Sequence, residues 1–343
     1  MANLPQSSRT FSGAIDRIAP DLELVERAMH EQLGSASDRI GHLGAHVLGA
    51  GGKRIRPALL VLCAEMCGYS GPRCVQVAAA VELLHTATLL HDDVVDLSEL
   101  RRGRPSANAI WGNRWAVLAG DFFYARASSM IVEDGVPDLL WVFADSIRSM
   151  SEGELLQLER SFDASVTETH YFQVIGRKSA ALLSAASESG GIVAGVTRAE
   201  RRRLAEFGRE LGLAFQLRDD ALDYEAGAEE LGKPPYADLR EGKVTLPLLL
   251  ALKRATPEER EAVTSVLKSA ARGAGLEPER GGAPELDIAP VLTVVERYRG
   301  VADTVRRAEL HSARAAAAIA PFCDGQPKED LLAAARFAVA RDR

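Results

Sequence analysis

Apolar residues recur every three or four positions over long stretches of this chain. One such stretch runs from Leu139 through Phe143 and Ile147 to Met150. This spacing places apolar side chains on one face of an α-helix. Neither the alternation expected of strands nor a strand–helix–strand rhythm is evident in the sequence. The pattern therefore predicts an all-α fold, a large helical bundle, rather than an α/β fold.

Glycine and proline predict where these helices are interrupted. Glycines within residues 49–52 precede a helix entered at Pro57, and residues 101–105 are expected to end the helix before them. Pro234 is expected to lie in a further loop. Residues 273–290 are rich in glycine, proline and glutamate, and are predicted to form an exposed variable loop.

The chain of 343 residues has a formal net charge of −7. We find no boundary that divides it, so we expect a single domain over 1–343 with a catalytic core at about 45–250. The modest acidic charge gives no support for a nucleic-acid partner. The sequence shows neither a signal peptide nor a run of about 18 apolar residues, which favours a cytoplasmic protein without a membrane span.

The cysteines do not predict a metal site. Cys63 and Cys67 are one helical turn apart, and Cys74 follows without a nearby fourth partner. A zinc site needs two pairs of ligands, so we interpret these residues, with Cys323, as reduced packing residues.

An acidic triplet, Asp92, Asp93 and Asp96, is the first candidate for chemistry. On a helix Asp92 and Asp96 share one face, and His85 lies two turns earlier. Carboxylates this close repel one another and favour either protonation or a bound cation. Mg²⁺ prefers such oxygen ligands and commonly bridges to phosphates. One triplet alone fits a solvated acidic helix face equally well.

A second triplet with the same spacing, Asp219, Asp220 and Asp223, lies within an apolar helical pattern. Two such triplets are hard to explain as solvated faces. Facing each other, they would hold several Mg²⁺ ions around a diphosphate. Cations that could bind such an anion occur around both triplets; they are Lys53, Arg54, Arg56, Arg101, Arg102, Lys178, Lys233 and Lys243. The segment around Lys53 is not a nucleotide P-loop, because Val47 and Arg54 break the spacing and no strand precedes it.

Seven segments occur here in the order found in trans-polyprenyl diphosphate synthases, and the chain most resembles the bacterial octaprenyl and solanesyl type. They are GGKRIRP, HTATLLHDDVVDLSELRRG, GDFFYARA, EGELLQL, RKSA, FQLRDDALDY and LGK…DLREGKVTLPL. The final FAVARDR is a weaker echo of the same family. A class I terpene cyclase would share one triplet, but it carries a different second metal motif and lacks GGKRxRP.

The resemblance implies a fold and a set of site residues. The family fold is an all-α bundle of the isoprenoid synthase type around a deep central cavity, usually as a homodimer. The residues expected to hold isopentenyl diphosphate are Lys53, Arg56, His85 and Arg102. Those expected to hold the allylic diphosphate are Arg101, Lys178, Ser179, Gln216, Lys233 and Lys243. The leading magnesium ligands would be Asp92, Asp96 and Asp219, supported directly or through water by Asp93, Asp220 and Asp223, with three Mg²⁺ per site.

Two positions depart from the family pattern. Ser179 replaces the usual threonine and keeps the hydroxyl group. Tyr236 stands where the family usually has glycine, which could alter how the following loop closes over the second triplet.

Chain length in this family depends on the residues one turn before the first triplet. Here these are Ala87 and Thr88, which provide no aromatic floor, and Phe143 aligns with a floor proposed further down. Phe143 fits an ordinary core residue nearly as well. We expect an octaprenyl product for quinone side chains, within a hepta- to decaprenyl range, and at most transient membrane contact for its release. The alternatives are a geranylgeranyl diphosphate synthase and a non-catalytic subunit of a heteromeric synthase.

Overall fold

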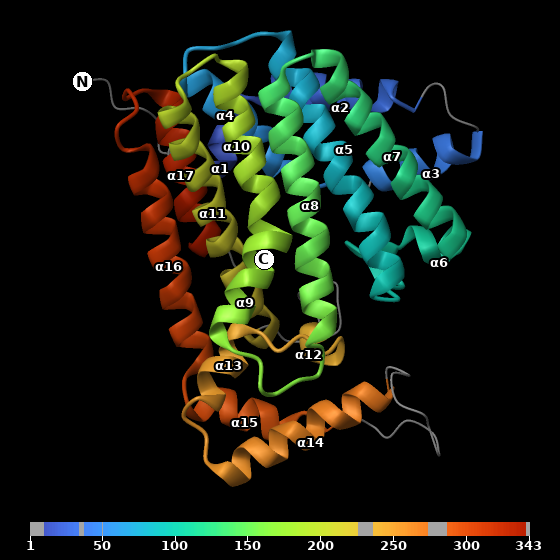
Figure 1. The fold of residues 1–343 in the computed structure, drawn as a ribbon, viewed down its shortest axis with the longest axis vertical. Helices are drawn as coiled ribbons and strands as arrows, with labels where there is room; N and C mark the ends of the chain where they lie inside the picture. The colour runs from blue at the N-terminus through green and yellow to red at the C-terminus, as the bar shows by residue number, and fades with distance from the viewer. Residues whose placement is uncertain (1–9, 34–37, 50, 226–235, 274–286, 341–343) are drawn as a thin grey trace.

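The structure is a computed structural model that describes residues 10–33, 38–49, 51–225, 236–273 and 287–340. Apart from one short hairpin, its elements are helices, which confirms the predicted all-α fold (Figure 1). The first half comprises α1 (Phe11–Arg17), α2 (Ala19–Glu31), α3 (Asp38–Leu48), α4 (Ile55–Met66), α5 (Pro72–Val95), β1 (Leu100–Arg101), β2 (Arg104–Pro105), α6 (Ala107–Trp111), α7 (Asn113–Asp134) and α8 (Pro137–Glu159).

The second half begins with α9 (Glu168–Ile175), which continues through a π-helical turn, η2 (Gly176–Ala180), into α10 (Ala181–Val193). The remaining helices are α11 (Arg198–Glu225), α12 (Ala237–Arg240), α13 (Leu246–Leu252), α14 (Pro257–Gly273), α15 (Ala289–Arg297), α16 (Gly300–Ile319) and α17 (Gln326–Ala340). Of the predicted variable loop, residues 274–286 lie outside the described residues.

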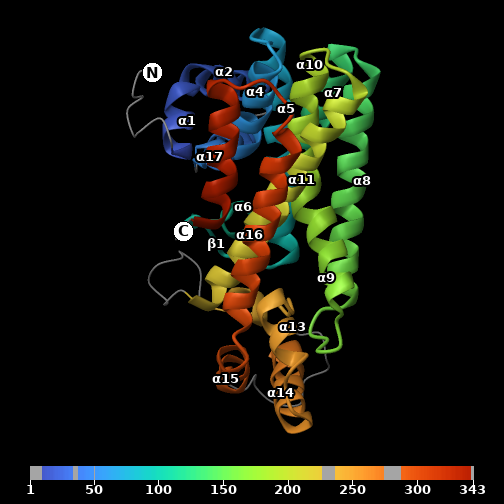
Figure 2. The ribbon, with the colours of Figure 1, turned by 90° about the vertical axis from the view of Figure 1, so that its left-hand side faces the viewer.

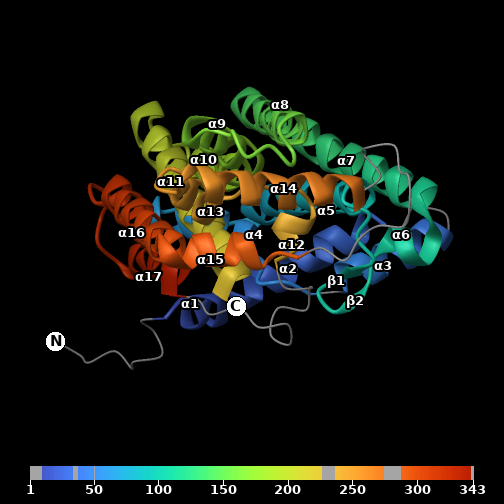
Figure 3. The same ribbon diagram turned by 90° about the horizontal axis from the view of Figure 1, so that it is seen from below.

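The long helices run side by side along the long axis of the molecule. In the bundle α11 packs against α16 and α10, and α5 packs against α7 and α4. Helices α14 and α15 lie across one end of the bundle (Figures 1 and 3). The N-terminal helix α1 packs against α17 on the side opposite α8 (Figure 2), and α2 packs against α5 and α4.

Two apolar cores fill the bundle. The upper core includes Leu59, Leu83, Phe123 and Phe207, and takes residues from α4, α5, α7, α8, α10 and α11. The lower core includes Tyr171, Leu217 and Leu246, and takes residues from α9, α11 and α13 to α16. Both α11 and the continuous α9–η2–α10 segment contribute to both cores, so they lie where the cores meet.

Helix α5 is the central element that carries the first triplet. It begins at Pro72, a residue whose fixed backbone angle suits the first helical turn. By length and composition α5 could cross a membrane, but 72% of its most apolar window is buried inside the bundle. We therefore interpret it as a core helix of the fold.

The end of α5 differs from the sequence prediction. The helix stops at Val95, well before residues 101–105, because the backbone turns back on itself. Leu97 adopts a left-handed φ of 51°, and the Ser98 N–H donates to the Asp93 carbonyl at 2.9 Å. These bonds close a Schellman-type cap with leucine in the usual glycine position.

Residues 100–105 form a two-stranded hairpin instead of a helix end. Leu100 pairs with Pro105 and Arg101 pairs with Arg104. The two turn residues, Arg102 and Gly103, both have positive φ (53° and 73°), as a type I′ turn requires. Arg101 and Arg102 therefore project from a hairpin beside the first triplet rather than from a helix.

Candidate active site

The three carboxylates of the first triplet point to different partners. Asp92 is partly buried and lines a cavity inside the bundle. Asp93 is only 3% exposed, and the Arg101 guanidinium lies 2.7 Å from its carboxylate. The C-cap residue Asp96 lies 3.3 Å from the Lys243 ammonium. Three aspartates that lie within five residues of the sequence thus occupy three different environments.

The second triplet, on α11, is divided in the same way. Asp219 lines the same cavity as Asp92. Asp220 is 1% exposed and accepts hydrogen bonds from neighbouring side chains on both oxygens. Asp223 accepts the Ala237 N–H at 3.0 Å, while its Oδ2 atom is buried without a hydrogen-bond partner. One aspartate from each triplet therefore faces a common space.

That cavity has a volume of about 380 Å³ and two chemically distinct parts. Its polar wall is formed by Arg56, His85, Asp92, Arg102, Lys178, Ser179, Gln216 and Asp219. Its apolar wall is formed by Ile55, Leu89, Met150, Leu182, Leu183 and Phe215. A ligand with a charged head and a hydrocarbon tail matches this division.

A smaller cavity of about 130 Å³ adjoins the first one. Lys178, Ser179 and Gln216 line both cavities. Lys243 and Asp220 line only the smaller one. These two cavities thus bring together Lys178, Ser179, Gln216 and Lys243, which were predicted to hold the allylic diphosphate. Arg101, predicted for the same role, lies on the hairpin and lines neither cavity. Lys233 lies outside the described residues.

Lys178 is presented by the π-helical turn η2. Such turns insert an extra residue into a helix and are frequent at functional sites. Its ammonium lies 2.5 Å from the Glu154 carboxylate on α8. Close approach of the two elements depends on Gly153, because a Cβ atom there would lie 2.7 Å from the Lys178 backbone nitrogen. Glu154 belongs to the EGELLQL segment, but the sequence alone did not predict that it pairs with Lys178.

Arg54 anchors the GGKRIRP segment, which contains Lys53 and Arg56, two of the residues predicted to bind isopentenyl diphosphate. Arg54 has a left-handed φ of 44°, donates to Glu82 at 3.0 Å and also pairs with Glu26. Its neighbour Lys53 lies 4.8 Å from the centre of the Phe337 ring, a cation–π contact with the FAVARDR segment. Arg54 therefore holds the loop, while other cations line the cavity.

Arg102 reaches this loop because Gly52 lacks a side chain. A Cβ atom on Gly52 would lie 2.6 Å from the Arg102 guanidinium. Arg56 and His85 line the same cavity, and the Arg56 Nε–H is buried without a partner. Burial together with Arg56 and Arg102 lowers the pKa of His85 well below its usual range. A neutral histidine among arginines suits an anionic ligand that accepts several hydrogen bonds.

Burial raises the pKa values of the acidic groups. It raises the pKa of Asp92 to about 6, although Lys178 acts in the opposite direction. Burial and then Asp238 raise the pKa values of Asp220 and Asp223 well above the usual aspartate range. Each carboxyl would therefore be stabilised in its ionised form by a bound cation.

The donors fit a metal that shares its coordination with a ligand. Among the described residues, no three His, Cys, Asp or Glu side chains lie together as a complete metal-binding group. Mg²⁺ keeps several waters and binds through one or two carboxylates together with substrate phosphates. Asp92, Asp219 and the unpartnered oxygen of Asp223 fit that kind of site.

We expect a pH-dependent difference in stability between the metal-free protein and its Asp92→Asn variant. The folded-state pKa of Asp92 is about 6, above its unfolded value near 4, so its stabilising effect is complete below pH 4 and is lost as pH rises through 6. Relative to the variant, the free energy of unfolding should fall by roughly 2 kcal/mol between pH 4 and pH 7. Urea unfolding at several pH values measures this difference, and parallel profiles would contradict it. The titration of His85 occurs in both proteins and cancels.

The backbone at Tyr236 accounts for the glycine that the family usually has at this position. Its φ of 59° lies in the left-handed region, where glycine has no steric penalty. The following N–H, of Ala237, donates to Asp223, so the segment still reaches the second triplet. The Tyr236 ring packs near Tyr224, with ring centres 6.2 Å apart.

The predicted chain-length residues occupy unequal positions. Thr88 lines the large cavity, one helical turn before Asp92. Ala87 is 2% exposed in the upper core and is not among the residues that line this cavity. Phe143 is 6% exposed, also in the upper core, two turns before the cavity residue Met150 on α8.

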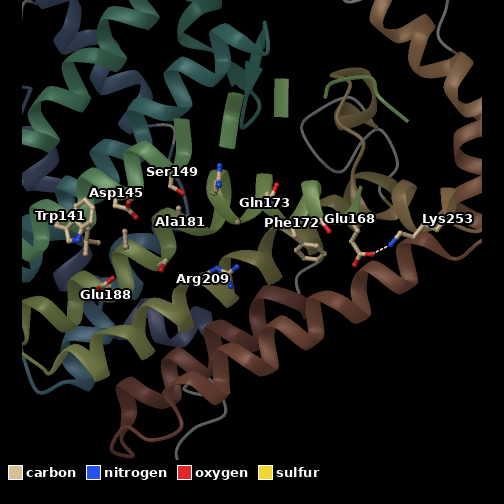
Figure 4. Close-up of a pocket in the computed structure, with 17 residues that line it drawn as sticks. Trp141, Asp145, Ser149, Glu168, Phe172, Gln173, Ala181, Glu188, Arg209 and Lys253 are labelled. Carbon is tan, nitrogen blue, oxygen red and sulfur yellow. Dashed lines mark hydrogen bonds and ion pairs between the residues drawn. The ribbon is translucent and has the colours of Figure 1, made fainter. Parts of the chain in front are cut away.

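A wider groove of about 990 Å³ lies along the outer side of η2, between α8 and α9–α11 (Figure 4). Trp141 and Phe172 form apolar parts of its wall, and Glu168 pairs with Lys253 at one end. None of the six predicted aspartates lines this groove. Its acidic and basic side chains are mixed, so it does not extend the diphosphate site.

Three comparisons place this chain among known proteins. The polyprenyl synthetase family model matches residues 37–275. Octaprenyl diphosphate synthase of Escherichia coli is 43% identical over 325 residues, covering 95% of this chain and 97% of that protein. The octaprenyl diphosphate synthase of Haemophilus influenzae is 38% identical, covering 94% of each.

A solved structure has the same fold. It is a polyprenyl synthase of Caulobacter crescentus complexed with calcium and isoprenyl diphosphate. The TM-score is 0.88 and the sequence identity 40%, with 99% of this chain and 100% of that one covered.

Proposed function

This chain belongs to the polyprenyl synthetase family and is a long-chain trans-prenyltransferase, and we propose that it makes octaprenyl diphosphate, within a hepta- to decaprenyl range. It would join farnesyl or geranylgeranyl diphosphate to several isopentenyl diphosphates. The observation that carries the proposal is the cavity that Asp92 and Asp219 share. It has an apolar wall, and position 88 holds threonine rather than an aromatic residue. A geranylgeranyl product is not favoured, because relatives similar over nearly the whole chain are octaprenyl diphosphate synthases.

The reaction begins with ionisation of the allylic carbon–oxygen bond. Lys178 and Lys243, with Arg101 nearby, would stabilise the negative charge that grows on the departing pyrophosphate. Divalent metal ions, when bound, would supply further positive charge to the same oxygens. The apolar wall that includes Met150 and Phe215 would exclude water from the allylic cation.

Condensation follows when the isopentenyl double bond attacks that cation. Lys53, Arg56, His85 and Arg102 would hold the isopentenyl diphosphate in line for the attack. A new carbon–carbon bond forms, and a proton leaves the adjacent carbon for the departed pyrophosphate. The product is again an allylic diphosphate, so the cycle can repeat.

The enzyme is expected to depend on a divalent metal, and we propose Mg²⁺, with three ions per site. A relative's structure contains calcium with isoprenyl diphosphate, which supports a shared metal and diphosphate site. Asp92, Asp96 and Asp219 are proposed as the leading ligands. Asp93 already pairs with Arg101, and Asp220 already accepts hydrogen bonds from Tyr171 and Gln216. These bonds support a role for the two aspartates as indirect rather than leading metal ligands.

Incubation of the purified chain with labelled isopentenyl diphosphate and farnesyl diphosphate tests this function. Products of hepta- to decaprenyl length are expected, and chelation of Mg²⁺ should abolish them. A geranylgeranyl product would overturn the chain length. Failure of the isolated chain to incorporate label would instead indicate a non-catalytic subunit, and release of a hydrocarbon would indicate a cyclase.

We propose that the chain is a homodimer joined through α7 and α8. These neighbouring helices expose large apolar side chains, namely Val117, Leu118, Tyr124, Val132, Leu140, Trp141, Leu155 and Leu158. Exposed apolar surface of this extent on adjacent helices is typical of an interface between subunits. Figure 3 shows both helices along one outer side of the bundle.

The Leu118→Glu variant should shift the mass measured by light scattering from dimer to monomer, because it places a charge in the proposed interface. Leu310→Glu changes a similarly exposed leucine on α16 and should leave the mass unchanged. A monomeric wild-type chain would contradict the proposal.

The remaining biological proposals rest on the family. We propose one domain over 1–343, a cytoplasmic location and a product used for quinone side chains. Transient membrane contact would allow the apolar product to leave. No nucleic-acid partner is proposed.

A further inference from the structure

Tyr171 lies outside the motifs that identify the family, yet its hydroxyl group is committed to the second triplet. It is 5% exposed on α9, and its ring packs edge-on against Phe172 with ring centres 5.3 Å apart. Its O–H donates to Asp220 Oδ2 at 2.5 Å. A buried tyrosine of this kind must satisfy its hydroxyl group, and here it does so on a carboxylate.

Asp220 continues the connection toward the cavity. Its second oxygen, Oδ1, accepts from Gln216 Nε2 at 2.8 Å. The other end of the same amide, Gln216 Oε1, accepts from Ser179 Oγ at 2.6 Å. Tyr171, Asp220, Gln216 and Ser179 thus form one hydrogen-bonded network, here named the Tyr171 network, across α9, α11 and η2.

The two ends of this network adjoin the reacting groups. Asp220 is next to Asp219, which lines the large cavity from α11. Ser179 is next to Lys178, which lines both cavities from η2. The network therefore ties α11 to the turn that presents Lys178.

The bonds also fix which way the groups point. Both oxygens of Asp220 accept hydrogen bonds, from the Tyr171 hydroxyl and from Nε2 of Gln216, so the Gln216 amide presents its nitrogen to Asp220. The amide oxygen must then face Ser179, whose hydroxyl hydrogen points to it. Without the Tyr171 hydroxyl, one oxygen of the buried Asp220 would lose its donor, which is costly for a buried polar group. Asp220 would then rotate or draw in water, and Gln216 and Ser179 would no longer be held in one arrangement.

We propose that Tyr171 is a positioning residue for the allylic half of the reaction. Through Asp220 and Gln216 it holds Ser179 and Lys178 in register with Asp219, around the diphosphate and its metal ions. Residues of the isopentenyl half, such as Arg56 and His85, lie on α4 and α5, which contribute no member to the Tyr171 network. This inference rests on the proposed function.

The Tyr171→Phe variant tests the proposal, because it keeps the ring and removes only the hydroxyl group. We expect the KM for farnesyl diphosphate to rise about tenfold and the KM for isopentenyl diphosphate to change less than about twofold. The dissociation constant for inorganic pyrophosphate with Mg²⁺, measured by calorimetry, should also rise about tenfold. Tyr298→Phe is the matched control, since it removes a hydroxyl that donates to Glu259 at 2.8 Å on the distant α14–α15 end.

A double-mutant cycle separates positioning through Asp220 from loss of packing. If Tyr171 acts through Asp220, the Tyr171→Phe/Asp220→Asn double variant should bind pyrophosphate no more weakly than Asp220→Asn alone. Effects that multiply would overturn the proposal, as would equal changes in both KM values or an unchanged dissociation constant. Thermal unfolding of each variant shows whether it is folded. If the wild-type chain binds pyrophosphate with Mg²⁺ but makes no polyprenyl product, the proposed function fails, and the binding cycle still decides the role of Tyr171.

Discussion

Replacing Asp92 with asparagine is expected to lower kcat by about 10³-fold, the equivalent of about 4 kcal/mol of transition-state stabilisation. The substitution keeps the shape of the side chain and removes its charge. Asp92 and Asp219 line the same cavity, so the Asp92 carboxylate could hold a metal ion against the departing pyrophosphate of the proposed reaction. The same loss should not occur for a carboxylate that only adds charge to the surface.

Asp16→Asn provides that comparison, because Asp16 is exposed on α1, away from the cavity. Single-turnover assays with saturating substrates and Mg²⁺ measure the chemical step for both variants. Asp16→Asn should retain the wild-type rate. Wild-type turnover in Asp92→Asn would remove Asp92 from the proposed metal site.

Replacing Thr88 with tyrosine is expected to shorten the product made from farnesyl diphosphate from octaprenyl to about geranylgeranyl length. Thr88 lines the large cavity one turn before Asp92, beside a space of about 380 Å³. A phenol ring there would occupy room that the growing chain needs, while leaving the diphosphate groups untouched. The first condensation should therefore keep a rate near that of the wild type. Sizing the products after extended incubation measures the change.

Thr293→Tyr makes the same substitution on an exposed site of α15 and should leave the product length unchanged. Ala87→Tyr is a different test, because Ala87 is enclosed in the upper core. Adding a large ring there should cost about 1–3 kcal/mol of stability through overpacking. Full-length product from Thr88→Tyr would show that the chain does not pass this residue.

The sequence predicted the helical fold and identified the two aspartate triplets as candidate metal ligands. Helical periodicity is a local property, so the pattern around Phe143 and Met150 was sufficient to indicate α8. The spacing of each triplet likewise indicated that Asp92 and Asp219 belong to a site. Spacing could not assign separate partners to neighbouring aspartates. Those partners, such as Arg101 for Asp93, come from elements placed by the tertiary fold.

Two residues of the site lacked a useful sequence signal. Tyr171 reaches Asp220 because α9 and α11 both contribute residues to the lower core. Glu154 reaches Lys178 because Gly153 lets α8 approach the π-helical turn. The hairpin at residues 100–105 was also missed, since its signal was a two-residue turn in which arginine takes a position more typical of asparagine or glycine.

The meeting of the two apolar cores has a consequence for how such an enzyme can diverge. Met150, Leu182 and Phe215 of the cavity's apolar wall belong to the upper core, whereas Tyr171 and Leu217 near the second triplet belong to the lower core. Substitutions in the apolar wall should therefore change packing mainly in the upper core. The lower core instead reaches the second triplet through Tyr171, which donates to Asp220. We therefore expect substitutions in the apolar wall to change the product length with less effect on the second triplet.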